Sequence, residues 1–380
     1  MIRMSDIAEQ AGVSQSTVSF VLNGRHETFR ISDETRLRVL RAAEELGYRP
    51  NHVARAVRTG NTRMVGIIGG DLATEHVGKM VGGVLDELDR HDYTLKILNL
   101  GRDGEPWGQA IRRSAELRLM GVIAMHLPLP MLEEFREEAH RYSYPLVLLD
   151  SRVPETDLSQ IVSDDQGGIA DAVDHLVQLG HRKIALINGE AISTLAHGRE
   201  RAFRAAMEGH ALRVPEALIF NGDFRFHERN EAIALKLLGL PDARRPTAIL
   251  CSSDRIALTV LHMARRLNRS VPQDVSVIGF GNFSASEFCW PSLSTVEQPF
   301  EAMGRAAARH LLSRCETKRP PRRRSPAEGS PAEGSPSQGA PERAELPAAE
   351  PSSAGSAPQG VVELLATRLI QRESTARAPD

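Results

Sequence analysis

The fold of the amino-terminal region is decided by residues 4–23, which read MSDIAEQAGVSQSTVSFVLN. Apolar residues recur at helical spacing on both sides of Gly12, which suits a tight turn because glycine has no Cβ. Ser5 and Ser14 are the expected N-caps, since a hydroxyl can accept from the unpaired backbone N–H groups of a helix start. The pattern predicts two short helices joined by a tight turn, which is a helix-turn-helix.

The outward-facing residues of the second helix are polar except for one phenylalanine. In a helix-turn-helix, the second helix enters the major groove of DNA with its amino-terminal end first. The residues expected to meet base edges are Gln15, Ser16, Ser19 and Phe20. Phe20 cannot donate a hydrogen bond, so its available chemistry is contact with a thymine methyl group. A helical hairpin without a nucleic-acid role is the alternative.

A third helix and a basic segment follow. Ser32 is the expected N-cap of this helix, and Gly47 is expected to end it. Its expected apolar face consists of Leu37, Leu40, Ala43 and Leu46. No acidic residue lies between Glu45 and Asp71, whereas Arg49, Arg55, Arg58 and Arg63 are all cationic. Such a segment can neutralise phosphates and release counterions, although a charged segment can also be a solvated face.

The segments SDIAEQAGVSQSTVSFVLNG, ISDETRLRVLRAAEELGYRPN and VARAVRTG resemble the DNA-binding headpiece of the LacI/GalR family of bacterial transcription regulators. This resemblance extends to Leu312 and resumes near Gly360. It implies an all-α headpiece at residues 1–48 and a hinge helix at 49–61, whose two copies enter the minor groove together in a homodimer. The residues that the resemblance and the helix pattern assign to DNA are Ser5, Ser14, Gln15, Ser16, Thr17, Ser19, Phe20, Asn23, Ala54, Arg55, Val57 and Arg58. The family usually has Leu at position 57, so Val57 would insert less deeply between bases.

From residue 62 onward, short apolar strands alternate with helices. The expected strands lie at 64–68, 93–98, 121–124, 145–149, 183–187, 248–250 and 275–279. The expected helices lie at 77–88, 108–119, 131–142, 170–179, 199–208, 230–238, 256–267 and 300–312. Continuous apolar strands joined by helices imply parallel sheets covered on both faces. Because this is too many strands for one small sheet, we expect two doubly wound α/β subdomains with a ligand cleft between them.

The resemblance implies that these subdomains form a periplasmic-binding-protein-like effector domain. We expect residues 62–162 and 293–316 in the amino-terminal subdomain and residues 163–292 in the carboxy-terminal subdomain. Residues 317–359 contain two copies of Ser-Pro-Ala-Glu-Gly and are expected to be a disordered insertion, because they bury too little apolar surface. Residues 360–380 are then expected to hold the displaced last strand and the tail.

The resemblance also implies an effector site in the cleft. Its expected residues are Asp71, Asp150, Ser193, Arg199, Phe224, Asp254 and Asn282. Arg199 offers a rigid donor fork that suits carboxylates, phosphates or vicinal hydroxyls, although it can also form a helix-start ion pair. Phe224 matches a ring that stacks on the ligand, and a core position is its alternative. Gly281 and Ser253 stand where the family commonly has Asp and Asn, so two groups that would bind a sugar or purine are missing.

Composition restricts the remaining function classes. The 380-residue chain has a formal net charge of -2, so its basic character must be local. Its three cysteines lack metal-ligand spacing, and we expect free thiols, no metal and no cofactor. The lack of a signal peptide or membrane span predicts a cytoplasmic, nucleoid-associated protein. No Walker lysine loop, G-x-S-x-G or H-E-x-x-H motif occurs, so no catalytic residue is expected.

These features together predict a sequence-specific DNA-binding transcriptional regulator. The resemblance favours a repressor that binds a near-palindromic operator as a homodimer. Its effector is expected to be a small molecule, with a carbohydrate as the first candidate. The alternative is a constitutive DNA-binding regulator with a vestigial or non-sugar pocket.

Overall fold

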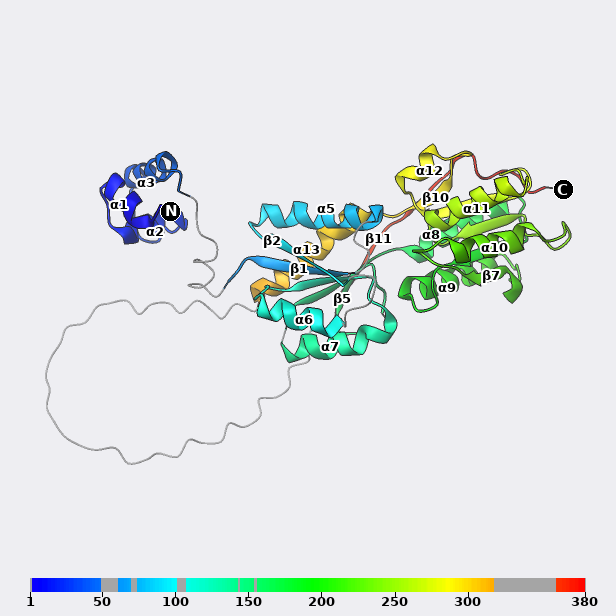
Figure 1. The fold of residues 1–380 in the computed structure, drawn as a ribbon, viewed down its shortest axis with the longest axis horizontal. Coiled ribbons are helices and arrows are strands. Elements are labelled where there is room, and N and C mark those ends of the chain that lie inside the picture. The colour runs from blue at the N-terminus through cyan, green and yellow to red at the C-terminus, as the bar shows by residue number, and fades with distance from the viewer. Residues whose placement is uncertain are drawn as a thin grey trace, which may run out of the picture. The chain divides into compact units, whose positions relative to one another are not determined.

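The computed structural model describes residues 2–48, 61–69, 74–100, 107–142, 144–153, 156–317 and 360–379. The chain forms two compact units, Met1–Thr62 and Arg63–Asp380 (Figure 1). The residues of the expected hinge before Asn61 and the expected insertion after Thr317 lie outside the described residues. Within the described ranges, no helix has the length and apolar character needed to cross a membrane.

Residues 2–48, the main described part of the first unit, form a bundle of three helices. Its helices are α1 (Met4–Ala11), α2 (Gln15–Leu22) and α3 (Asp33–Glu45). Gly12 ends α1 in the left-handed conformation with φ 66°. The Ser14 hydroxyl caps α2 by accepting from the Thr17 backbone N–H at 3.1 Å. The helices pack around a small apolar core centred on Ile7, Val18 and Val39, and the predicted helix-turn-helix is therefore confirmed.

Two details of this unit differ from the predictions. Ser5 does not cap α1, because the helix begins at Met4 and the Asp6 carboxylate accepts from the Arg3 backbone N–H at 2.8 Å. The Ser5 hydroxyl instead donates to Asp6 at 3.1 Å. Leu37 and Leu40 of α3 are 46% and 38% exposed. The buried stripe of α3 consists of Val39, Ala42 and Ala43, so the inward face is rotated away from the two leucines.

The second unit begins with a six-stranded, all-parallel sheet in the order β11-β5-β4-β3-β1-β2. Its strands are β1 (Met64–Gly69), β2 (Thr94–Asn99), β3 (Val122–Met125), β4 (Leu146–Leu149), β5 (Ser159–Ser163) and β11 (Val362–Leu365). One face is covered by α5 (Glu75–Arg90) and α13 (Phe300–Thr317). The other is covered by α6 (Trp107–Glu116) and α7 (Leu132–Arg141). Figure 1 shows these helices as two outer layers.

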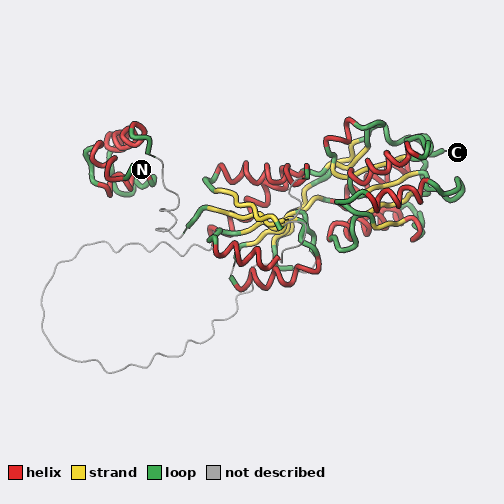
Figure 2. Tube along the Cα trace, in the orientation of Figure 1, coloured by secondary structure: helices red, strands yellow, loops and turns green. Residues whose placement is uncertain are grey.

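A second six-stranded sheet has the order β12-β10-β9-β8-β6-β7. Its strands are β6 (Ile184–Asn188), β7 (Ile219–Asn221), β8 (Ala248–Cys251), β9 (Ser276–Gly281), β10 (Ser294–Glu297) and β12 (Arg368–Ile370). Its covering helices are α8 (Asp165–Gln178) and α9 (Thr194–Gly209) on one face, and α10 (Glu228–Leu238) and α11 (Asp254–Arg266) on the other. Figure 2 shows the same alternation of strands and helices in both subdomains. The predicted pair of doubly wound parallel-sheet subdomains is thus confirmed, with β12 antiparallel to β10.

The subdomain boundaries differ from the prediction near the carboxyl end. β10 pairs with β9 in the second sheet, so residues 293–297 belong to the carboxy-terminal subdomain rather than the amino-terminal one. The returning segment also forms two strands instead of one. β11 pairs with β5 and β12 pairs with β10, because each sheet presents an open strand edge whose backbone groups need partners. The chain therefore crosses between the sheets from β5 to α8, from β10 to α13 and from β11 to β12.

Candidate functional site

The amino-terminal end of α2 presents polar side chains to solvent. Gln15 and Ser16 are exposed, whereas Val18 and Val21 face the core. The Ser14 and Thr17 hydroxyls lie 2.9 Å apart, so both are held at the helix start. This arrangement leaves two neighbouring hydrogen-bonding side chains free to reach beyond the first turn of α2.

Phe20 lies on the same helix but has an aromatic partner. Its ring stacks on Phe29 with 3.6 Å between centroids and 12° between planes. The Arg25 guanidinium lies 5.0 Å from the Phe29 centroid and 5.9 Å from the Phe20 centroid. One face of Phe20 is therefore covered by Phe29, and contact with a base can use only the rest of the ring. Asn23 donates to the Ser19 carbonyl and so helps to end α2.

A cleft of about 780 Å³ lies between the two subdomains of the second unit. Four of the predicted effector residues line it, namely Asp150, Ser193, Arg199 and Phe224. Asp254 and Asn282 do not line it, and Asp71 lies outside the described residues, as do Ala54, Arg55, Val57 and Arg58 of the expected hinge. The cleft also contains residues that the sequence pattern did not predict, among them His76, His126, Glu190 and Gln298.

Arg199 is buried on α9 and is fixed in place by several contacts. Its Nε donates to the Asp165 carboxylate at 2.8 Å, and its Nη1 donates to the Ser252 carbonyl at 2.6 Å. The guanidinium also lies 4.1 Å from the Phe280 ring centroid. Burial raises the pKa of Asp165, although the charge of Arg199 opposes that change. Arg199 therefore forms an ion pair, as the alternative interpretation predicted. The same side chain also lines the cleft.

Asp150 and His126 form a pair at the ends of two neighbouring parallel strands. His126 follows β3 and Asp150 follows β4, and both have left-handed backbones with φ of 53° and 52°. Such strain in non-glycine residues clusters at functional sites. His126 Nε2 lies 3.0 Å from Asp150 Oδ2. Asp150 lines the cleft, and its Oδ1 is buried without a hydrogen-bond partner within the described part of the chain, so this carboxylate has an acceptor oxygen that is not used.

The electrostatics of this wall favour an ionised Asp150 carboxylate and a neutral His76 imidazole. Burial alone would raise the pKa of Asp150, but the hydrogen bond and charge of His126, followed by the charge of Arg199, hold it below its ordinary value. Burial lowers the pKa of His76 to about 3, and the neighbouring charge of His126 adds to this effect. His76 Nδ1 is also buried and without a partner among the described residues.

Asp254 and Asn282 serve the interior of the carboxy-terminal subdomain. The Asp254 carboxylate accepts from the Phe283 backbone N–H at 2.7 Å, from the Ser286 hydroxyl at 2.8 Å and from the Thr295 hydroxyl. The Asn282 amide donates to Glu297 at 2.9 Å and accepts from Arg372 at 2.8 Å. Their predicted place in the cleft is wrong because these partners hold both side chains away from it.

Ser193 and Phe224 both line the cleft and also stabilise their own subdomain. Ser193 is the N-cap of α9, and its hydroxyl accepts from the Ala196 backbone N–H at 3.4 Å. Phe224 packs against the core of its subdomain as well as lining the cleft. A Cβ on Gly189 would lie 2.0 Å from the Phe224 ring, so that glycine makes room for the aromatic wall.

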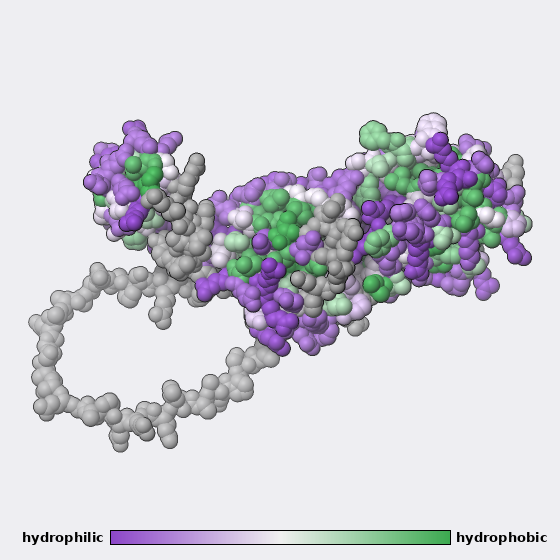
Figure 3. All heavy atoms as spheres, in the orientation of Figure 1, coloured by the Kyte–Doolittle hydropathy of each residue, from purple (hydrophilic) through white to green (hydrophobic). Residues whose placement is uncertain are grey.

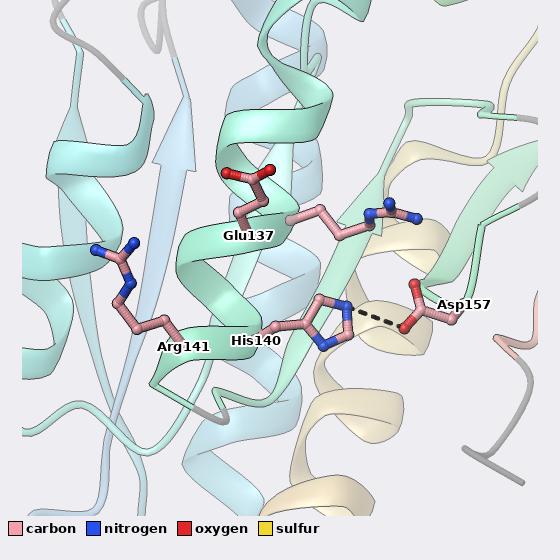
Figure 4. Close-up of a pocket in the computed structure, with 5 residues that line it drawn as sticks. Glu137, His140, Arg141 and Asp157 are labelled. Carbon is pink, nitrogen blue, oxygen red and sulfur yellow. Dashed lines mark ion pairs between the residues drawn. The ribbon is translucent and has the colours of Figure 1, made fainter.

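A second hollow lies on the surface of α7 and differs in character (Figure 4). It is lined by Arg136, Glu137, His140, Arg141 and Asp157. His140 and Asp157 pair with each other at 3.2 Å, and the lining has no apolar side chain. Among the described residues, no cluster of His, Cys, Asp and Glu could hold a metal ion. The interdomain cleft is therefore the stronger candidate for a ligand site.

Comparisons with known proteins match both units. Residues 3–51 match "Bacterial regulatory proteins, lacI family", and residues 173–334 match "Periplasmic binding protein-like domain". The chain is 32% identical over 323 residues to the HTH-type transcriptional repressor PurR of Escherichia coli. The aligned region covers 84% of this chain and 92% of the repressor.

Solved structures show the same architecture over almost the whole chain. The transcriptional regulator CelR in its cellobiose complex is 26% identical with a TM-score of 0.67, covering 98% of this chain and 100% of that one. The lac repressor dimer bound to operator and the anti-inducer ONPF is 22% identical with a TM-score of 0.76, covering 99% of each chain. The latter likeness shows a shared fold.

Proposed function

The chain belongs to the lacI family of bacterial regulatory proteins, and we propose on that premise that it represses transcription from a near-palindromic operator. It is a DNA-binding transcriptional regulator with an effector domain. The observation that carries this proposal is the helix-turn-helix unit, with exposed Gln15 and Ser16 at the start of α2. DNA as the partner implies that the protein works at the bacterial nucleoid.

Base reading is assigned to the exposed start of α2. Gln15 can form a bidentate contact with adenine, and Ser16 can donate to or accept from several bases. Phe20 offers its uncovered ring surface to a thymine methyl, because Phe29 stacks on its other face. The flanking Ser5, Ser14, Thr17, Ser19 and Asn23 fit phosphate contacts or helix ends. The hinge residues Ala54, Arg55, Val57 and Arg58 remain predicted contacts for the minor groove and the backbone.

Operator symmetry calls for a homodimer. Phe288, the last residue of α12 (Ser284–Phe288), is 82% exposed, and Trp290, two residues later, is 86% exposed. Figure 3 shows hydrophobic residues at the surface in the region of this helix. Exposed large apolar side chains that lie together mark protein interfaces. A second copy of the chain is the proposed occupant of this surface, and the lac repressor, which shares the fold, has been solved as a dimer.

The interdomain cleft is the proposed effector site. The unpartnered Asp150 Oδ1 supplies an acceptor, Arg199 supplies a fixed cation, and Phe224 supplies an apolar wall. A carbohydrate is the first candidate, and the structural neighbour CelR was solved with cellobiose. The alternative is a constitutive regulator with a vestigial or non-sugar pocket. This alternative is favoured because Asp254 and Asn282 form hydrogen bonds within the carboxy-terminal subdomain instead of lining the cleft.

These two functions can be separated by thermal unfolding of the full-length protein. The protein is screened against mono- and disaccharides, nucleobases and nucleosides, with and without an operator duplex selected in vitro. Inducible repression predicts that at least one compound raises the midpoint and changes operator affinity, because a ligand that binds the folded state stabilises it.

Matched arginine variants locate the response. Arg199→Lys should abolish the shift, since the fork that reaches the cleft is lost. Arg204 lies on the same helix and pairs with Glu200 and Glu216 on the surface. The Arg204→Lys variant should therefore show the same ligand-induced shift in midpoint as the parent protein. If no compound changes either stability or operator affinity, the constitutive alternative is correct.

A further inference from the structure

A set of contacts joins the two subdomains along one flank of the cleft. Glu75 is the first residue of α5 in the amino-terminal subdomain, and Ser284 is the first residue of α12 in the carboxy-terminal subdomain. The Ser284 backbone N–H donates to the two Glu75 carboxylate oxygens at 3.0 and 3.1 Å. The Ser284 hydroxyl donates to Glu75 Oε1 at 2.8 Å. Hydrogen bonds to an ionised acceptor are among the stronger ones in proteins.

The neighbouring residues add an aromatic contact across the same boundary. His76 stacks on Phe283 with 5.5 Å between ring centroids and 7° between planes. Phe283 follows β9 of the second sheet, but its ring packs against the apolar core of the amino-terminal subdomain. It also lies 6.2 Å from the Phe300 ring. The polar and aromatic contacts therefore join the same two segments.

Each side of this junction is anchored to its own subdomain. In the carboxy-terminal subdomain, Asp254 holds the Phe283 backbone N–H and the Ser286 hydroxyl, which fixes the start of α12 on the start of α11. In the amino-terminal subdomain, the Lys79 ammonium lies 2.8 Å from Glu75. A movement of one subdomain relative to the other must therefore break the Glu75–Ser284 bonds or displace an anchored helix end.

The ionisation of Glu75 is compatible with this role. Burial alone would raise its pKa, but the hydrogen bonds from Lys79 and Ser284 hold the pKa below its ordinary value. The group is thus a charged acceptor at neutral pH. Glu75, His76 and Phe283 also line the cleft, so the junction and the candidate ligand site share a wall.

We propose that Glu75 is a positioning residue that holds the cleft closed by bonding Ser284, so that Glu75–Ser284 acts as a clasp between the subdomains. Breaking the clasp lowers the population of the closed cleft. The apparent affinity of any ligand that needs the closed form falls by the same fraction. The expected effect of the clasp on ligand affinity rests on the proposed function. The effect of the clasp on the relative position of the two subdomains does not.

Hydrogen–deuterium exchange on the full-length protein, without DNA or effector, tests the clasp directly. Glu75→Ala removes the acceptor, so exchange should rise about tenfold or more at residues 283–286, as expected for losing a hydrogen bond to a charged group. Exchange should also rise in the cleft walls at residues 126–127 and 190–195, which are not part of the Glu75–Ser284 bonds. Glu75→Gln keeps one acceptor oxygen and should give an intermediate rise.

Asp86→Ala is the matched control, because it removes a carboxylate of the same helix that pairs with Arg305 on the surface and leaves the Glu75–Ser284 bonds in place. Its exchange at residues 283–286 and in the cleft walls should match that of the parent protein. A Glu75→Ala effect confined to residues 283–286 would show that Glu75 only caps α12 and would overturn the proposal. Unchanged exchange throughout would overturn it as well. Because the measurement needs no ligand, failure of the effector proposal cannot be mistaken for failure of the clasp.

Discussion

Acidification should destabilise the effector unit through His76. Burial lowers the folded-state pKa of His76 from 6.5 to about 3, so the unfolded chain binds a proton at mildly acidic pH while the folded chain does not. Stability from this group is fully present above the unfolded pKa and is lost as the pH falls from there toward the folded pKa. Each pH unit in this window costs about 1.4 kcal/mol, which gives roughly 2 kcal/mol between about pH 7 and pH 5.

The assay compares thermal unfolding of the full-length protein with that of His76→Phe across this pH range. Phenylalanine keeps a ring against Phe283 but cannot titrate. The midpoint of the parent protein should fall by roughly 4–8 °C more than that of the variant, given about 2–4 °C per kcal/mol for a domain of this size. His262→Asn on the exposed side of α11 is the control and should follow the parent protein. Parallel pH profiles for the parent protein and His76→Phe would refute the reasoning.

Three further predictions concern the DNA surface, the subunit contact and the interior. Gln15→Ala should reduce the preference for operator over random DNA in competition binding, and an equal loss of affinity for both would reject its base-reading role. Trp290→Asp should turn dimers into monomers in sedimentation experiments, because it places a charge in an apolar contact. An unchanged mass would exclude Trp290 from the interface. Asp254→Ala should cost roughly 2–4 kcal/mol in denaturant unfolding, since buried donors lose their acceptor. Loss of a ligand response at unchanged stability would instead return Asp254 to the effector site.

Local pattern was enough to predict the fold class. Helical spacing around Gly12 and apolar runs such as residues 145–149 depend on neighbours in sequence, and the corresponding elements formed. The pattern failed where the choice depended on packing. Leu37 and Leu40 are as apolar as Val39, and only the position of α1 and α2 decides that Val39 is the buried one. The short strand β7 and the strand β5, which contains three polar residues among five, gave no clear signal.

The candidate site was predictable at the residues that follow the carboxyl ends of the parallel strands. Asp150 follows a buried strand, and such positions in parallel sheets face the ligand. His126 follows the neighbouring strand and could have been found by the same rule. Asp254 and Asn282 also follow this rule, but their partners Phe283, Thr295 and Arg372 are distant in sequence and hold them inside the subdomain. The clasp depends on residues 209 positions apart, which no local pattern can reveal.

Genome-wide footprinting of bound sites tests the central claim most directly. The parent protein should protect a small set of sites that share one near-palindromic motif, and Gln15→Ala should change the bases preferred within each half-site while retaining the two-fold symmetry. Protection that is spread along the genome without a shared motif, and that is unchanged by Gln15→Ala, would contradict the assignment of this chain as a sequence-specific repressor.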